Sequence, residues 1–214
     1  MKNIFKETEN FVKSMIVSSF SGHDFEHTNR VVRAAIKIAA KEGGDITVIR
    51  FGALLHDIGD YKFNNGDEKI GPERARKWLH SQKLDDSLIN QVVEIVATVS
   101  FKGEGIPSPS LEGMIVQDAD RLDAIGAIGI ARCFAFGGSR ERNMFNPSEL
   151  NNYKKPTPNE YKNNKRSTLT HFYDKLLSIS DELNTRTARE MSQQRHQFMT
   201  NFLDQFFLEW AGEK

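Results

Sequence analysis

The sequence predicts an all-α protein, and three observations support this fold class. Apolar residues recur at the three- and four-residue spacing of amphipathic helices along most of the chain. Residues that start and stop helices lie at the ends of these stretches, such as Asp45 before an apolar run and Gly43-Gly44 after another. The only plausible strand, LINQVVEIVATVSF at residues 88–101, is long enough to favour a helix.

In the first half of the chain, local signals set the expected helix boundaries. Gly43-Gly44 should end a helix that starts near Asp24, and Asp45 should cap the next one. Pro72 suits the first turn of a further helix, because that turn needs no amide donor. The predicted helices cover residues 4–19, 24–42, 46–58, a stretch from about 72, and 86–99.

The second half begins with a loop, FKGEGIPSPS, which is rich in glycine and proline. From Leu111 we predict one long apolar helix to about Phe136, with a kink at Gly126 or Gly129. The remainder should form a loop over 137–161 and two helices over 162–180 and 185–211. We expect one domain over residues 1–214, a helical bundle whose motif-bearing core covers about 20–136.

The composition excludes several classes of protein. Lysine and arginine together number 29, as do aspartate and glutamate, so the formal net charge is zero and favours neither nucleic acid nor a membrane surface. The single cysteine, Cys133, excludes an intrachain disulfide. The N-terminal residues lack the unbroken apolar region of a signal peptide, and no apolar run is long enough to span a membrane. A cytoplasmic location is therefore expected.

Four potential metal ligands fall on the predicted inner faces or ends of three separate helices. His27 shares a face with Val31 and Ile38, and Asp120 shares one with its apolar neighbours. His56 and Asp57 end an apolar helix. Two imidazoles and two carboxylates suit Mn²⁺, Fe²⁺ or Zn²⁺ better than Mg²⁺. Each residue alone is more often a hydrogen-bonded core residue or a helix cap, and the occurrence of all four at inward positions of separate helices favours a metal site. An all-α domain whose buried polar groups pair with one another is the alternative.

Three motifs resemble the HD-domain metal-dependent phosphohydrolases. They are HTNRVV at 27–32, LLHDIGD at 54–60 and DADRLDAIGAIGIAR at 118–132, which follow the order H, HD, D. Further stretches, from GHDFEH to the C-terminal helix, are similar to the small single-domain bacterial HD hydrolases of the YedJ/YpgQ type. The resemblance covers residues 20–211 and implies metal ligation by His27, His56, Asp57 and Asp120. Asp118 and Asp123 are the alternatives for the last ligand, and the family pattern selects Asp120.

The resemblance also implies catalytic roles beside the metal. Asp57 would contact both ion and water, and Asp60, three residues later, would help to activate that water, as in the alarmone-degrading HD hydrolases. Those enzymes carry a Glu-Asp pair where this chain has a single aspartate, and a helix cap is the other reading of Asp60. Lys62 directly follows the site and is expected to take part in catalysis and to bind phosphate.

Other cations near the motifs are candidates for phosphate binding. They are Arg30, one turn after His27, Lys102 in SFKG, and Arg121 beside Asp120. Each could instead be an ordinary surface charge. The segment 137–167 carries seven basic residues against three acidic ones, which fits either a lid over an anionic substrate or a solvated loop.

The predicted function is metal-dependent hydrolysis of a phosphoester or phosphoanhydride bond in a nucleotide, including the release of pyrophosphate from a nucleoside triphosphate. Mn²⁺ is the favoured cofactor, with Mg²⁺, Fe²⁺, Co²⁺, Zn²⁺ and Ni²⁺ as alternatives. A metal-containing module that binds a nucleotide or RNA without turnover is the second hypothesis. The sequence implies no protein partner, and it does not distinguish a monomer from a homodimer.

Overall fold

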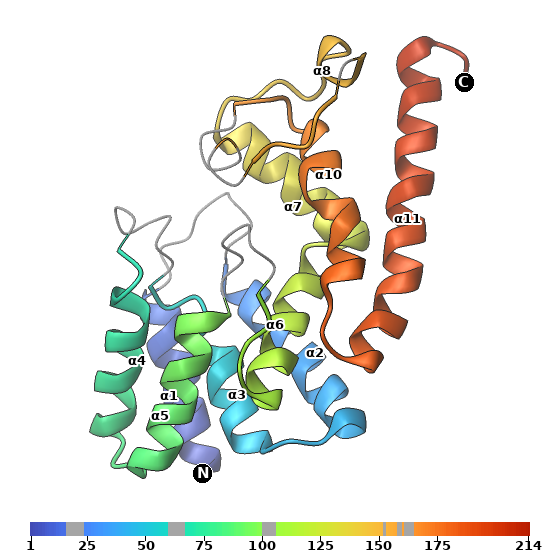
Figure 1. The fold of residues 1–214 in the computed structure, drawn as a ribbon. Helices are drawn as coiled ribbons and strands as arrows, with labels where there is room; N and C mark the ends of the chain where they lie inside the picture. The colour runs from blue at the N-terminus through green and yellow to red at the C-terminus, as the bar shows by residue number, and fades with distance from the viewer. Residues whose placement is uncertain (16–23, 60–66, 100–105, 152, 158–159, 161–164) are drawn as a thin grey trace. The chain divides into compact units, whose positions relative to one another are not determined.

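Every regular element that the structure describes is a helix (Figure 1), which confirms the predicted all-α class. The structure is a computed structural model and describes residues 1–15, 24–59, 67–99, 106–151, 153–157, 160 and 165–214. Up to Asp120 these residues form one compact unit, and from Arg121 onward they form a second. The single domain over the whole chain stays a prediction.

The first unit is built from helices whose ends follow the local signals in the sequence. Asp24 and Asp45 accept hydrogen bonds from the first turns of α2 and α3, and Gly43 ends α2 with a φ of 89°. The predicted helix over residues 4–19 is described as far as Met15. The helices are α1 (Lys2–Met15), α2 (Phe25–Glu42), α3 (Ile46–Leu55), α4 (Ile70–Ser81), α5 (Asp86–Thr98) and most of α6 (Leu111–Asp123).

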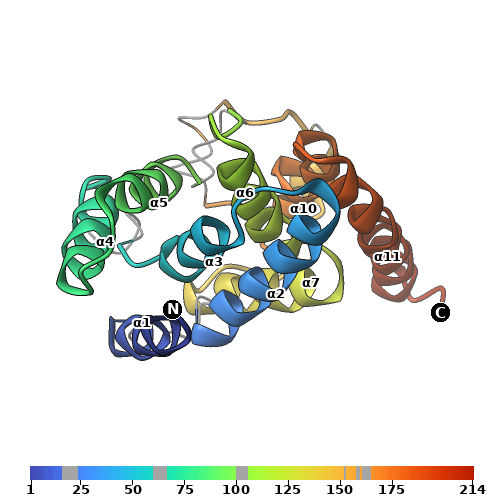
Figure 2. The ribbon, with the colours of Figure 1, turned by 90° about the horizontal axis from the view of Figure 1, so that it is seen from below.

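The most apolar of these helices lies at the centre of the first unit. α3 packs against α1, α2 and α5, and α4 packs against α5. Seen from below, α4 and α5 run side by side with α3 next to α5 (Figure 2). Phe51, Leu54 and Leu55 of α3 are almost fully buried. This packing holds the C-terminal end of α3, which carries the HD pair, inside the unit.

The predicted single helix from Leu111 to Phe136 is wrong, because the structure has two helices there. α6 ends at Asp123, and α7 (Gly126–Ser139) begins after an extended residue, Ile125. Gly126 has a φ of 76°, which an L side chain rarely adopts. A Cβ on Gly129 would lie 2.3 Å from the Ala124 carbonyl oxygen. The two glycines therefore allow a full break where the sequence predicted only a kink.

The predicted helix over 162–180 is also wrong. The structure has a short helix α10 (Thr170–Asp174) and a 3-10 helix η2 (Leu176–Glu182). Lys175 between them has φ −148° and ψ −53°, and the Ser178 hydroxyl donates to its carbonyl at 3.0 Å. Such side-chain bonds compete with the α-helical pattern. The last helix, α11 (Arg186–Ala211), matches its predicted bounds and packs on α7 and η2.

The predicted loop 137–161 is partly ordered by the chain that follows it. α7 extends to Ser139, and a short helix α8 (Ser148–Asn151) lies within the loop. The amides of Thr168 and Leu169 donate to the carbonyls of Asn143 and Met144 at 2.8 and 2.9 Å. The role of this segment as a lid stays a prediction.

No single described helix combines the length and apolar character of a membrane span. Of the described helices, only α6 and α7 taken together have both the length and the apolar character of a span, and a bend separates these two helices.

Candidate metal centre

His27 lies in the first turn of α2 and points inward, as predicted. Its backbone amide donates to the Asp24 side chain at 2.8 Å, the bond that starts the helix. Its side chain is 1% exposed and shares the buried face with Val31 and Ile38. Local capping and amphipathicity together place this imidazole in the interior.

His56 and Asp57 follow the last residue of α3. His56 keeps helical backbone angles, and its Nδ1 atom lies 2.9 Å from the Ala53 carbonyl oxygen. A carbonyl only accepts, so Nδ1 carries the proton and donates, and the neutral ring presents a lone pair at Nε2. The sequence pattern did not predict this bond.

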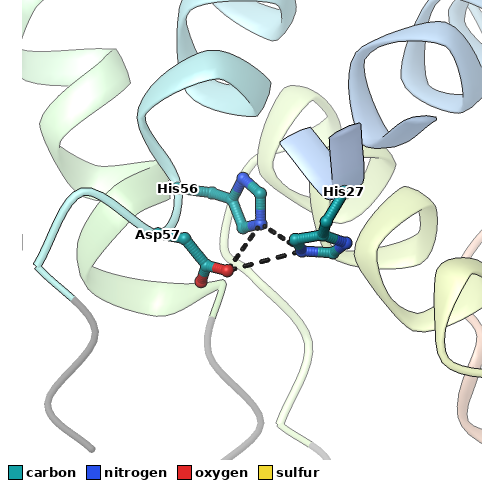
Figure 3. Close-up of side chains that lie close together, drawn as sticks. All are labelled: His27, His56 and Asp57. Carbon is teal, nitrogen blue, oxygen red and sulfur yellow. Dashed lines mark hydrogen bonds and ion pairs between the residues drawn. The ribbon is translucent and has the colours of Figure 1, made fainter. Parts of the chain in front are cut away.

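The two imidazoles and Asp57 converge on one point (Figure 3). The Nε2 atoms of His27 and His56 are 3.2 Å apart, and Asp57 Oδ2 is 3.4 Å from each of them. All three ligand atoms lie within 4.8 Å of one another.

Asp120 joins this group from α6. Its Oδ1 atom is 3.4 Å from His27 Nε2 and 3.8 Å from His56 Nε2. The carboxylates of Asp57 and Asp120 are 22% and 28% exposed, whereas both imidazoles are almost fully buried. The donor cluster is therefore reached from solvent on its carboxylate side.

The charges of the cluster favour a cation at its centre. Burial alone would lower the pKa of His56, but the Asp57 and Asp120 carboxylates raise it above its ordinary value. Burial would raise the pKa of Asp120, but the hydrogen bond with His27 and the electrostatic attraction to the two histidines hold it well below its usual range. The Asp120 carboxylate thus stays ionised and attracts positive charge.

The donor spacing fits a single divalent metal ion. Two atoms bonded to one ion at about 2.1 Å lie about 3.0 Å apart at a right angle and about 3.4 Å apart at a tetrahedral angle. The distances between His27, His56 and Asp57 are 3.2 and 3.4 Å. Nitrogen and oxygen donors of this kind bind first-row transition metals. The cluster therefore suits a divalent metal.

The other two aspartates of the motif are also buried. Asp118 is completely buried on α6. Asp123 forms an ion pair with Arg132 at 2.6 Å, which bridges the break between α6 and α7. Asp57 and Asp120, by contrast, each have a carboxylate oxygen within 4 Å of both imidazoles.

The predicted substrate and catalytic residues are only partly described. Arg30 lies half-buried on α2, one turn after His27. Arg121 is 4% exposed, and its guanidinium donates to the Glu182 carbonyl. Asp60, Lys62 and Lys102 lie outside the described residues.

Comparison with known proteins identifies the family. The HD domain family matches residues 24–125, which include all four predicted ligands. YpgQ of Bacillus subtilis is 34% identical over 212 residues, which cover 94% of this chain and 90% of YpgQ. The chain therefore belongs to the HD-domain family, and this confirms the resemblance seen in its motifs.

Solved structures of similar proteins cover nearly the whole chain. An HD-superfamily hydrolase of Bacillus thuringiensis has a TM-score of 0.76 at 36% identity and covers 98% of both chains. A Lactobacillus plantarum protein has a TM-score of 0.84 at 29% identity over 99% of both. The structure of YpgQ in complex with ADP has a TM-score of 0.74 at 32% identity, over 94% of this chain and 95% of that one. The HD-type fold and the enzyme class, an HD-superfamily hydrolase, are thereby confirmed.

Proposed function

We propose that this protein is a divalent-metal-dependent phosphohydrolase that cleaves a phosphoester or phosphoanhydride bond of a nucleotide. The observation that carries the proposal is the convergence of His27, His56 and Asp57, with Asp120 beside them, on one point. The ADP bound to YpgQ supports a nucleotide as the ligand. Release of pyrophosphate from a nucleoside triphosphate is one form of the proposed reaction.

The four clustered side chains would hold the ion, and Mn²⁺ is the favoured one. When bound, such an ion lowers the pKa of water toward neutrality and polarises a phosphoryl oxygen. His56 is prepared for this role because the Ala53 carbonyl fixes its tautomer. Asp57 and Asp120 supply the negative charge that balances the cation.

The roles proposed for the other residues are based on their positions in the sequence relative to the metal ligands. Asp60 would take a proton from the attacking water or orient it. Lys62, Arg30 and Lys102 would bind the substrate's phosphate groups, and Lys62 would also stabilise the charge that develops during attack. Arg121 has less support in this role, because its buried guanidinium already donates to the Glu182 carbonyl.

A screen for released phosphate and pyrophosphate tests the proposal. Purified protein, stripped of metal and reloaded with Mn²⁺, Mg²⁺, Co²⁺ or Zn²⁺, is incubated with nucleoside mono-, di- and triphosphates and with sugar phosphates. We expect turnover of at least one nucleotide, abolished by chelation. Tight nucleotide binding without turnover under any metal would contradict the proposal and would favour the metal-containing binding module.

A further inference from the structure

A helix without metal ligands holds the turn that carries His56 and Asp57. Arg74, in α4, donates from Nη1 to the carbonyl oxygen of Ile58 at 3.0 Å. Ile58 directly follows Asp57 and is 4% exposed. A buried carbonyl needs a donor, and Arg74 supplies one from the neighbouring helix.

Gly59, the next residue of the turn, packs against the backbone of the same helix, α4. A Cβ on Gly59 would lie 2.6 Å from the Gly71 backbone nitrogen and 2.7 Å from its Cα atom. The turn thus lies directly against the first turn of α4, at a distance that only glycine permits. Two contacts with α4, one polar and one steric, fix the backbone at the two positions after Asp57.

We infer that Arg74 is a positioning residue for the metal centre. The direction of the Asp57 carboxylate depends on the backbone of residues 57–59, because the side chain extends only two bonds from its Cα atom. By holding the Ile58 carbonyl, Arg74 keeps Asp57 Oδ2 at 3.4 Å from both imidazoles. The inference rests on the proposed function, since it requires the cluster to bind a metal ion.

The test measures metal binding to the metal-free protein. Arg74→Met removes the donor and keeps much of the side chain's apolar length. We expect its affinity for Mn²⁺, measured by calorimetric titration, to be about 10- to 100-fold weaker, the usual effect of losing a group that orients a metal ligand. The visible absorption spectrum of the Co²⁺-loaded variant should also change, because the coordination geometry changes.

The matched control lies on the same helix. Arg76 is exposed and donates to Asn90 at 2.9 Å, away from the turn after Asp57. Arg76→Met removes the same charge from α4, and we expect its Mn²⁺ affinity and Co²⁺ spectrum to match those of the unmodified protein. Arg74→Lys keeps a cationic donor at the critical position and should recover part of the lost affinity.

The possible results separate this inference from the proposed function. Equal Mn²⁺ affinity in Arg74→Met and Arg76→Met would overturn the role of Arg74 alone. Absence of metal binding in the unmodified protein would overturn the proposed function and the inference with it. An Arg74→Met variant whose helical circular dichroism collapses along with its affinity, with no recovery in Arg74→Lys, would show a general folding role and would also overturn the inference.

Discussion

The Nε2 atoms of His27 and His56 lie 3.2 Å apart, although the residues are separated by 29 positions in the sequence. Because the protonated Nδ1 atom of His56 donates to the Ala53 carbonyl oxygen, the neutral ring turns the Nε2 lone pair toward His27 and Asp57. Lone pairs and carboxylate oxygens at this separation repel one another unless a proton or a metal ion lies between them. This pair of imidazoles is the basis of the predictions that follow.

Removal of a ligand should empty the site. His56→Ala and Asp57→Ala each delete one donor of the cluster, so we expect elemental analysis to find the metal lost and turnover to be abolished. His80→Ala is the control, because His80 is an exposed histidine on α4 that pairs with Asp86. Full metal occupancy in both ligand variants would refute the assignment. Chelation should lower the melting temperature of the unmodified protein, since a bound metal stabilises only the folded state.

Asp60→Asn should separate catalysis from metal binding. Asparagine keeps the shape of the side chain but accepts a proton poorly, so we expect a fall in kcat of about 10² to 10⁴, the usual range for a general base. Metal content and substrate affinity should be retained. Loss of metal would make Asp60 a ligand and would point to a site with two ions. Normal turnover would show that water activation does not need this carboxylate.

Arg30→Ala should lower the catalytic efficiency, kcat/KM, without changing the metal content. If Arg30 contacts phosphate, kcat/KM should fall by roughly tenfold or more, which corresponds to about 1.4 kcal/mol or more of lost stabilisation. Arg33→Ala is the matched control, because Arg33 lies one turn further along α2 and is exposed. Equal kinetics in the two variants would make Arg30 an ordinary surface charge. Lys62→Ala should likewise lower kcat/KM relative to Arg33→Ala without changing the metal content.

The metal-free protein should become less stable as the pH rises above 6.5. Burial lowers the pKa of His56, but Asp57 and Asp120 raise it more, so that its folded-state pKa exceeds the ordinary value of 6.5. A raised histidine pKa stabilises the folded state fully below 6.5, and this contribution is lost as the pH rises through the folded-state value. Melting curves measured with a chelator should show this loss of stability. The dependence of the melting temperature on pH should be weaker in His56→Gln.

Added Mn²⁺ should give the opposite dependence on pH. Metal binding requires an unprotonated Nε2 atom, so the stabilisation by Mn²⁺ should grow over the same pH range in which the chelated protein weakens. The two series of melting curves can be measured side by side. An Mn²⁺ effect that is independent of pH would argue against His56 as a ligand.

Glu149 should stabilise the second unit only above its pKa. Its carboxylate accepts bonds from the Ser167 amide and hydroxyl and from the Thr170 hydroxyl, at 2.9, 2.8 and 2.6 Å. Burial would raise the pKa of Glu149, but these bonds lower it below the ordinary value of 4.5. A lowered carboxylate pKa contributes stability above pH 4.5, which is lost as the pH falls through the folded-state value.

Glu149→Gln should therefore lower the melting temperature at pH 7, and the difference from the unmodified protein should shrink in acid. Glu141→Gln, at an exposed position of the same segment, is the control and should change little. A melting temperature for Glu149→Gln equal to that of the control at pH 7 would contradict this role.

Much of the fold could be predicted because helix boundaries are local. Asp24, Asp45 and Gly43 act on amides and carbonyls within a few residues of themselves, and their effects appear in the structure as predicted. The inward direction of His27 follows from the periodicity of its own helix. The break at Gly126 was underestimated, because its extent depends on the approach of the Ala124 carbonyl to Gly129.

The pattern of residues was enough to identify the side chains that could bind a metal and the helices near which they lie. The packing of α2 on α3 brings three of their donor atoms within 4.8 Å of one another, and no pattern within one helix predicts that distance. The bond from Arg74 to Ile58 was not predictable from the sequence either, since it joins α4 to a turn residue 16 positions earlier. Periodicity and capping act within one helix, whereas the geometry of a metal site is set by contacts between helices.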